Sequence, residues 1–123
     1  MSEAGDSCVF CRIVAHTAPA TIHYEDADIV AFDAEPAATA LHVLVVPRRH
    51  IRSVAELADT ELAGRLVLVA SRIAAEARAK SFRLATNSGA PLQDVFHLHW
   101  HVMADGAMGH PAGIAFSRPP QES

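Results

Sequence analysis

The sequence is poor in cysteine, in aromatic residues and in basic charge, and it has no long apolar run. Its 123 residues include two cysteines, one tryptophan and one tyrosine, and its 10 Lys and Arg against 14 Asp and Glu give a formal net charge of -4. A protein that binds nucleic acid through the phosphates needs a basic surface, which this composition does not supply. The most apolar stretches, Leu41–Val46 and Leu66–Ala70, are too short to cross a bilayer. We therefore expect neither a nucleic-acid partner nor a membrane partner.

The length and the N-terminus favour one domain in the cytoplasm. The first ten residues contain acids and no basic segment, unlike a secretory signal. Hydrophobic residues make up 50% of the chain and charged residues 20%, as is typical of globular proteins. A chain of this length can bury one core but not two. The sequence predicts a single domain over residues 1–123, with flexible ends at 1–7 and 117–123.

One segment has the apolar spacing of a helix. Its apolar side chains recur every three or four residues, at Leu62, Leu66, Val69, Ile73 and Ala77. This spacing puts them on one helical face. Asp59 or Thr60 is expected to cap the start, and Glu61 is expected to pair with Arg65 on the exposed side. A shorter helix or turn is expected over Cys8–Ala15.

Five other runs favour strands. They are Ile22–Glu25, Ile29–Phe32, Leu41–Val46, Phe82–Thr86 and Val95–Met103. A polar turn at 26–28 joins the first two as a hairpin, and Pro47 ends the third because proline has no backbone N–H to donate. Hairpins outnumber strand–helix–strand units, so the sequence predicts an α+β fold. Its parts would be a mainly antiparallel sheet of about five strands, one long helix and a short N-terminal helix.

Three histidines stand at alternate positions, His97, His99 and His101. Alternate side chains of a strand share a face, so these imidazoles are expected on one side and the apolar residues between them on the other. A single histidine is most often a core or surface residue with a hydrogen-bond partner, but three in strict alternation are not explained in that way. Two functions fit them. One is a cage of metal ligands, and the other is chemistry on a phosphate, in which one imidazole attacks while its neighbours donate.

An imidazole is suited to the second function. Its pKa of about 6.5 leaves it largely neutral at pH 7. A hydrogen bond from Nδ1–H to a backbone carbonyl would leave the Nε2 lone pair facing the phosphorus. The resulting nitrogen–phosphorus bond is labile to water, so one difficult step is divided into two.

The only cysteines, Cys8 and Cys11, are three residues apart. Such a pair can be free thiols, a redox pair or half of a metal site. A redox pair of the thioredoxin type lies between a strand and a helix, whereas this pair lies at the N-terminus. A tetrahedral zinc site would need two more ligands, which the histidines could supply.

The whole pattern resembles the histidine triad (HIT) superfamily, and within it the HINT-like phosphoramidases. The segments that carry the resemblance are Cys8–Val14, Tyr24–Asp26, Ala31–Asp33, His42–Ile51, Asn87–Gly89 and His97–Met103. The resemblance implies the HIT-like fold. It also implies a nucleotide hydrolase that cleaves a phosphoramidate or phosphoanhydride bond at the α-phosphate of a purine nucleotide.

The resemblance also implies roles for single residues. His99 would be the nucleophile that forms a nucleotidyl-histidine intermediate, His101 would donate to a phosphate oxygen, and His42 would support the cluster. Phe10, Ile13, Phe32 and Asp33 would shape the nucleoside pocket, and Asn87 and Gln93 would lie on the substrate.

In the zinc-bearing branch of the superfamily, the ligands resemble Cys8, Cys11, His50 and His97. Zinc would then be structural and would tie the N-terminus to the triad, with unligated thiols as the alternative. The resemblance further implies a homodimer that pairs through a helix and a sheet edge.

The loop before the triad departs from the family pattern. Asp94 stands where a serine near the leaving group is expected. An ionised aspartate would repel a phosphate, whereas a protonated one could donate to a departing amine, so Asp94 is a further candidate catalytic residue. This departure keeps other functions open. They are a nucleotide-binding scaffold with little turnover, a dinucleoside polyphosphate hydrolase, a nucleotidyl transferase and, more remotely, a metal-storage protein.

Overall fold

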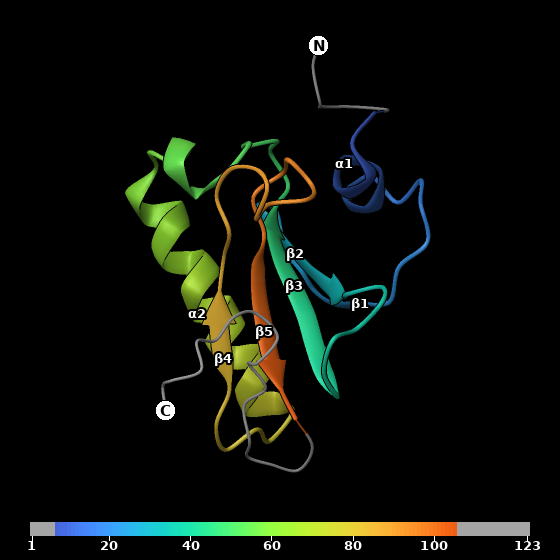
Figure 1. Ribbon diagram of the computed structural model, residues 1–123, viewed down its shortest axis with the longest axis vertical. Helices are drawn as coiled ribbons and strands as arrows, with labels where there is room; N and C mark the ends of the chain where they lie inside the picture. The colour runs from blue at the N-terminus through green and yellow to red at the C-terminus, as the bar shows by residue number, and fades with distance from the viewer. Residues whose placement is uncertain (1–6, 106–123) are drawn as a thin grey trace.

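The computed structural model describes residues 7–105, which form one sheet between two helices (Figure 1). The elements in chain order are α1 (Val9–Val14), β1 (Ile22–Glu25), β2 (Ile29–Asp33), β3 (Leu41–Pro47), a single 3₁₀ turn (Val54–Glu56), α2 (Thr60–Glu76), β4 (Arg83–Ala85) and β5 (Trp100–Ala104). No helix in the described part of the chain is both long and apolar enough to span a bilayer. Except for Ser7, the ends expected to be flexible lie outside the described residues.

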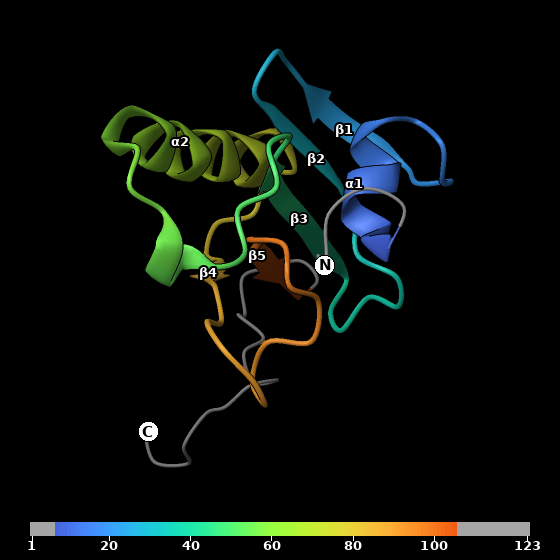
Figure 2. The same ribbon diagram turned by 90° about the horizontal axis from the view of Figure 1, so that it is seen from above.

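The five strands form an antiparallel sheet in the order β1-β2-β3-β5-β4. Helix α2 covers one face of the sheet, and α1 lies on the other (Figure 2). The alternation of side chains along β2 separates the faces: Ile29 and Ala31 pack with α2, whereas Val30 and Phe32 pack with α1. The predicted α+β class, antiparallel sheet and two helices are confirmed.

Helix α2 forms where the apolar spacing predicts it. Asp59 is its N-cap, and its carboxylate accepts a hydrogen bond from the backbone N–H of Leu62 at 3.0 Å. The helix buries the predicted apolar face, apart from Ala77, which is its exposed C-cap. The predicted pairing of Glu61 with Arg65 is wrong. The guanidinium of Arg65 instead reaches the β1–β2 turn, where it pairs with Asp26 and Asp28.

The strand predicted over Val95–Met103 is wrong at its start, because β5 begins only at Trp100. Pro47 explains the difference. It has no N–H for the ladder, and its carbonyl oxygen accepts a hydrogen bond from the ring of His97 at 2.8 Å. The N–H of Leu98 therefore bonds to the carbonyl of Ile51 at 2.7 Å, outside the sheet. The alternation still holds, since Leu98 packs under α2 while His97 and His99 contact Phe10 of α1.

Candidate active site and metal centre

Four side chains from three segments converge beside α1. Cys8 and Cys11 come from the start of α1, His50 follows β3, and His97 precedes β5, and their ligand atoms all lie within 4.8 Å of one another. Nδ1 of His97 is 3.4 Å from Sγ of Cys8 and 3.5 Å from Sγ of Cys11, whose Sγ is also 3.3 Å from Nδ1 of His50. Tetrahedral zinc bonds to sulfur and nitrogen would set these separations at about 3.6 Å. The four residues are therefore close enough to hold one metal ion, and the donor set is compatible with zinc.

Hydrogen bonds orient two of these ligands. The ring Nε2–H of His97 donates to the carbonyl of Pro47, so its Nδ1 lone pair faces the thiols. Burial lowers the pKa of His97 to about 4, so its imidazole is neutral, as a ligand must be. The N–H of Cys11 donates to Sγ of Cys8 at 3.3 Å, which holds the N-cap sulfur on the same side.

The same histidine orients His99. Nδ1–H of His99 donates to the main-chain carbonyl of His97 at 2.8 Å, which confirms the predicted bond to a backbone carbonyl. The Nε2 atom of a neutral His99 then carries the lone pair. The residue is only 4% exposed, and this burial lowers its pKa and favours the neutral, nucleophilic form.

A relay of hydrogen bonds fixes the tautomers of His42 and His101. The backbone N–H of Ala38 donates to Nδ1 of His42 at 2.9 Å, so the proton of a neutral His42 lies on Nε2. That Nε2–H donates to Nδ1 of His101, also at 2.9 Å, and so the proton of His101 lies on its own Nε2. Burial lowers the pKa of His42 and brings that of His101 to about 4, so both rings are neutral at pH 7. The role of Ala38 could not be predicted from the sequence, because a backbone amide leaves no signal in a residue pattern.

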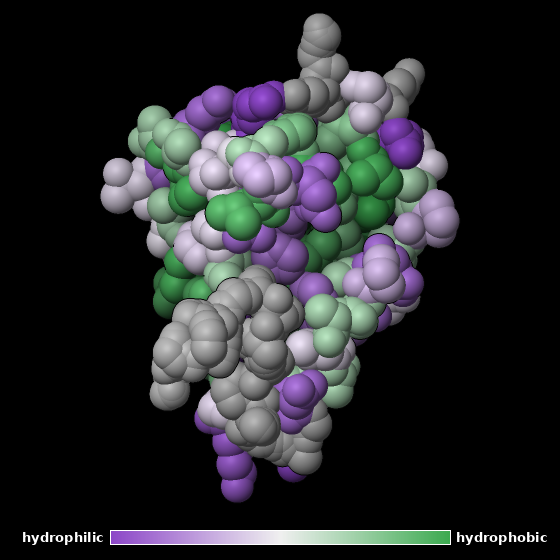
Figure 3. Space-filling view, viewed as in Figure 1, coloured by the Kyte–Doolittle hydropathy of each residue, from purple (hydrophilic) through white to green (hydrophobic). Residues whose placement is uncertain are grey.

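The imidazoles of His42, His99 and His101 open into one cavity of about 450 Å³. Most of the residues predicted for catalysis and for the nucleoside line it: Phe10, Ile13, Phe32, Asp33, His42, Asp94, His99 and His101. The Phe10 ring centroid lies 5.0 Å from that of His99 and 5.4 Å from that of Phe32, edge to face in both pairs. Apolar surface gathers on this side of the molecule, beside α1 (Figure 3).

Residues 15–108 match the family of HIT domains. The chain belongs to the HIT domain family. Protein HitA of Neisseria gonorrhoeae is 41% identical to it over 103 residues, which cover 80% of this chain and 95% of that protein. The predicted membership of the HIT superfamily is thereby confirmed.

Solved structures agree with this HIT assignment. A HIT family hydrolase from Clostridium thermocellum superposes with a TM-score of 0.79 at 35% identity, covering 87% of this chain and 97% of that one. A hypothetical histidine triad nucleotide-binding protein from Sulfolobus tokodaii gives a TM-score of 0.73 at 28% identity, covering 90% and 76%. The HIT match begins at residue 15, so Cys8 and Cys11 lie outside the matched residues.

Two residues predicted on the substrate are not brought to the cavity of this HIT domain, namely Asn87 and Gln93. Gln93 is only 4% exposed and holds its own loop together. Its Oε1 accepts from the N–H of Gly89, and its Nε2 donates to the carbonyls of Arg52 and Val95. The amide is thus used within the protein, and Gln93 supports the loop that carries Asp94.

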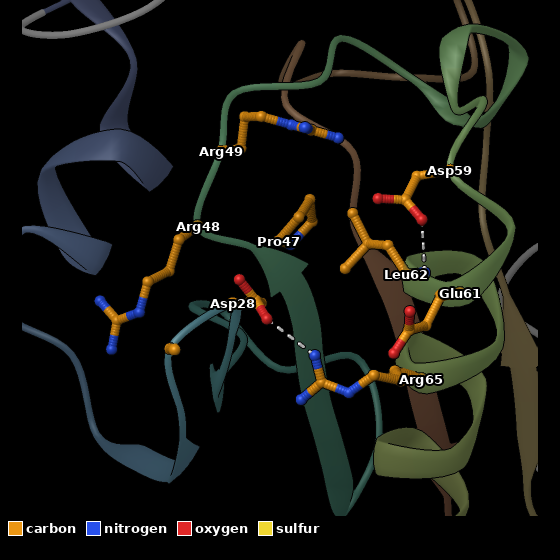
Figure 4. Close-up of a pocket in the computed structure, with 9 residues that line it drawn as sticks. Asp28, Pro47, Arg48, Arg49, Asp59, Glu61, Leu62 and Arg65 are labelled. Atoms are coloured by element: carbon orange, nitrogen blue, oxygen red, sulfur yellow. Dashed lines mark hydrogen bonds and ion pairs between the residues drawn. The ribbon is translucent and has the colours of Figure 1, made fainter.

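A second hollow, of about 330 Å³, lies between the start of α2 and the β1–β2 turn (Figure 4). Several of its polar groups are engaged in contacts that hold the fold together. Arg65 pairs with Asp28 at 2.9 Å, and the carboxylate of Asp59 caps α2. Arg48 points away from the hollow and donates to the carbonyl of Val14 at the end of α1. This hollow therefore belongs to the framework that joins α2, the turn and α1.

Proposed function

We propose that this HIT protein cleaves a phosphoramidate or phosphoanhydride bond at the α-phosphate of a purine nucleotide, with His99 as the nucleophile. The observation that supports this proposal is the pair of tautomers that hydrogen bonds set for His99 and His101. The hydrogen bond from Nδ1–H of His99 to a carbonyl leaves a free lone pair on its Nε2. The relay of hydrogen bonds from Ala38 leaves a proton on Nε2 of His101, which can therefore donate. The two rings lie 5.0 Å apart, centroid to centroid, so attack at phosphorus and donation to its oxygen can act on one phosphate.

The rest of the cavity suits a nucleoside. Phe10, Ile13 and Phe32 present apolar surface beside His99, as a flat purine requires, and the cavity volume is in the range of small-molecule sites. Asp33 lines the same cavity and would accept from the ribose hydroxyls. Contacts of Asn87 and Gln93 with the substrate stay predictions from the resemblance.

We also propose that zinc occupies the metal centre. Two thiolates and two imidazoles form a closed set of four ligands, which is typical of structural zinc. Such an ion supplies a cross-link and no open position for substrate. Within this chain, Cys8 and Cys11 would tie α1, with its cavity residue Phe10, to His97, whose carbonyl orients His99.

The first test is turnover of adenosine 5′-phosphoramidate by the wild type and by His99→Ala. We expect the variant to lose about 10³-fold or more of kcat/KM, because the attacking nitrogen is gone. The matched control is His16→Asn, which removes an exposed imidazole outside the cavity. Asparagine tolerates the left-handed backbone of His16, whose φ is 64°. Turnover of His99→Ala within about threefold of the wild type would contradict the proposal.

A second candidate function is nucleotide binding with little turnover. The position of Asp94 favours it, because an exposed carboxylate in the cavity wall repels the phosphate that must approach His99. Calorimetry that shows micromolar binding of AMP without product from any nucleotide substrate would support this function. Multiple turnover would exclude it. A dinucleoside polyphosphate hydrolase or a nucleotidyl transferase would share the attack by His99 and differ in the leaving group or the acceptor.

We propose that the protein pairs as a homodimer. Helix α2 exposes Leu68 at 69% and Val67 at 38% on the side away from the sheet, and β4 is an edge strand with β5 as its one neighbour in the described sheet. A second copy could cover both features. Light scattering after gel filtration should give twice the mass of one chain. A monomer at about 50 μM would contradict this proposal.

A further inference from the structure

The charged residues that line the cavity are all acidic. Asp33 ends β2, Glu35 follows it, and Asp94 lies in the loop before β5. Within residues 7–105, neither an arginine nor a lysine lines this cavity. Arg12 lines a neighbouring hollow that shares Asp94 but not the triad. A nucleotide in the cavity would therefore meet imidazoles and carboxylates instead of the cationic side chains that commonly hold phosphates.

The three carboxylates are not equivalent. Oδ1 of Asp33 lies 2.7 Å from Nε2 of His23 on β1, away from the triad. One oxygen of this carboxylate is therefore already engaged with a side chain of the protein. Asp94 lies on the triad side. Its negative charge raises the pKa of both His99 and His101, although burial has the larger, lowering effect on each. Asp94 is also exposed, so solvent and a bound substrate can both reach its carboxylate.

We infer that Asp94 is a specificity-determining residue, which selects substrates whose leaving group carries a positive charge close to the scissile bond. The inference rests on the proposed function, because it assumes attack by His99 at an α-phosphate. The chemical class that it names is a nucleoside 5′-phosphoramidate of an amine that bears a second, cationic amino group. The class that it disfavours is a polyphosphate, whose leaving group would bring further negative charge next to Asp94.

The reaction is balanced without any co-reactant except water. Nε2 of His99 forms a bond to phosphorus as the bond between phosphorus and the amine nitrogen breaks, and the electron pair of that bond leaves with the nitrogen. Water then adds to phosphorus and releases His99. Overall, one hydrogen of that water goes to the departing amine and its hydroxyl stays on phosphorus, which gives the nucleoside monophosphate.

The selection is electrostatic. The repulsion between Asp94 and the α-phosphate is common to all nucleotide substrates, so it lowers their rates alike and does not discriminate among them. A positive charge on the leaving group attracts Asp94, whereas a neutral group of the same shape does not. Opposite charges about 6 Å apart at a partly solvated site favour the cationic substrate about tenfold.

The test compares two adenosine 5′-phosphoramidates of equal length, one made with 3-aminopropylamine and one with butylamine. We expect wild-type kcat/KM to be about tenfold higher for the aminopropyl compound, and this ratio to fall in 0.5 M salt. Asp94→Asn keeps the shape and removes the charge, so its ratio should lie within about twofold of unity. Glu35→Gln is the matched control. It removes a carboxylate that follows β2, outside the loop that carries Asp94, and should keep the wild-type ratio.

A wild-type ratio near unity, or a ratio that Asp94→Asn leaves unchanged, would overturn the inference. Failure of the proposed function looks different, since neither compound would then be turned over. In that case, calorimetry measures the dissociation constants of the aminopropyl and butyl compounds and their ratio. The His99→Ala variant is used because it cannot form the covalent intermediate. A preference for the aminopropyl compound that disappears in Asp94→Asn/His99→Ala would uphold the role of Asp94 as a binding selector. Equal dissociation constants for the two compounds would contradict this role of Asp94.

Discussion

The two faces of the sheet have the same strands but different chemistry. The face under α2 is an apolar core, in which Leu66, Leu98 and Val102 have no exposed surface. The face toward α1 carries both the four candidate metal ligands and the cavity, with His97 and His99 buried among polar partners. Alternate residues of the segment 97–103 therefore have different tasks: Leu98 and Val102 pack in the core, whereas His99 and His101 line the cavity. The sheet can place imidazoles in a buried site because its other face supplies the packing that stabilises the fold.

Removing a metal ligand should have the largest effect on the α1 face. Cys11→Ser keeps the size of the side chain and loses the thiolate, so we expect loss of bound zinc and a thermal midpoint lower by about 10 °C or more. Elemental analysis and thermal unfolding, with and without chelator, measure both effects. Wild-type protein prepared without chelator that holds less than about a tenth of an equivalent of zinc would refute the metal assignment.

Leu66→Ala should separate stability from chemistry on the other face. Leu66 is fully buried beneath α2, so truncation should cost about 2–5 kcal/mol of unfolding free energy while kcat stays within about twofold. Urea unfolding and turnover are the measurements. Glu61→Ala, at an exposed position of the same helix, should change the unfolding free energy by about 0.5 kcal/mol or less. A large loss of kcat in folded Leu66→Ala would show that the two faces are not independent.

Breaking the relay should affect rate more than affinity. We expect His42→Ala to lower kcat about 10- to 100-fold with little change in KM, because His101 loses the donor that sets its tautomer. Added imidazole should restore part of the rate by occupying the space that His42 leaves. A rise in KM alone, without rescue by imidazole, would mean that His42 only packs against the substrate.

The smallest effect is the pH dependence of stability. The pKa of His101 is about 4 in the folded protein and about 6.5 in the unfolded chain. Between these values the unfolded chain binds the additional proton, so His101 makes stability fall as the pH falls from about 6.5 toward about 4. Urea unfolding at pH 7 and pH 5 should show a smaller loss for His101→Gln than for the wild type. Equal losses would mean that His101 has the same pKa in both states.

Features that depend on neighbouring residues could be predicted from the sequence, whereas features that depend on distant contacts could not. The spacing that begins at Leu62 and the cap at Asp59 predict α2 because both depend on neighbours within one helical turn. The partner of Arg65 depends on the distant β1–β2 turn, and local charge spacing predicts the wrong one. Gln93 has the residue type of a substrate contact, but its amide bonds to backbone groups that no motif reveals.

The chemical groups and their alternation can be read directly in the amino-acid sequence. Three imidazoles with apolar residues between them specify two faces, and two thiols near the N-terminus are compatible with half of a metal site, because residue type and period are local properties. The folded structure, in contrast, sets how these groups are used. It joins Cys8 and Cys11 to His50 and His97, and it brings the N–H of Ala38 to His42. Proton position and metal geometry depend on distances between segments far apart in the chain, and the packing of the whole fold sets those distances.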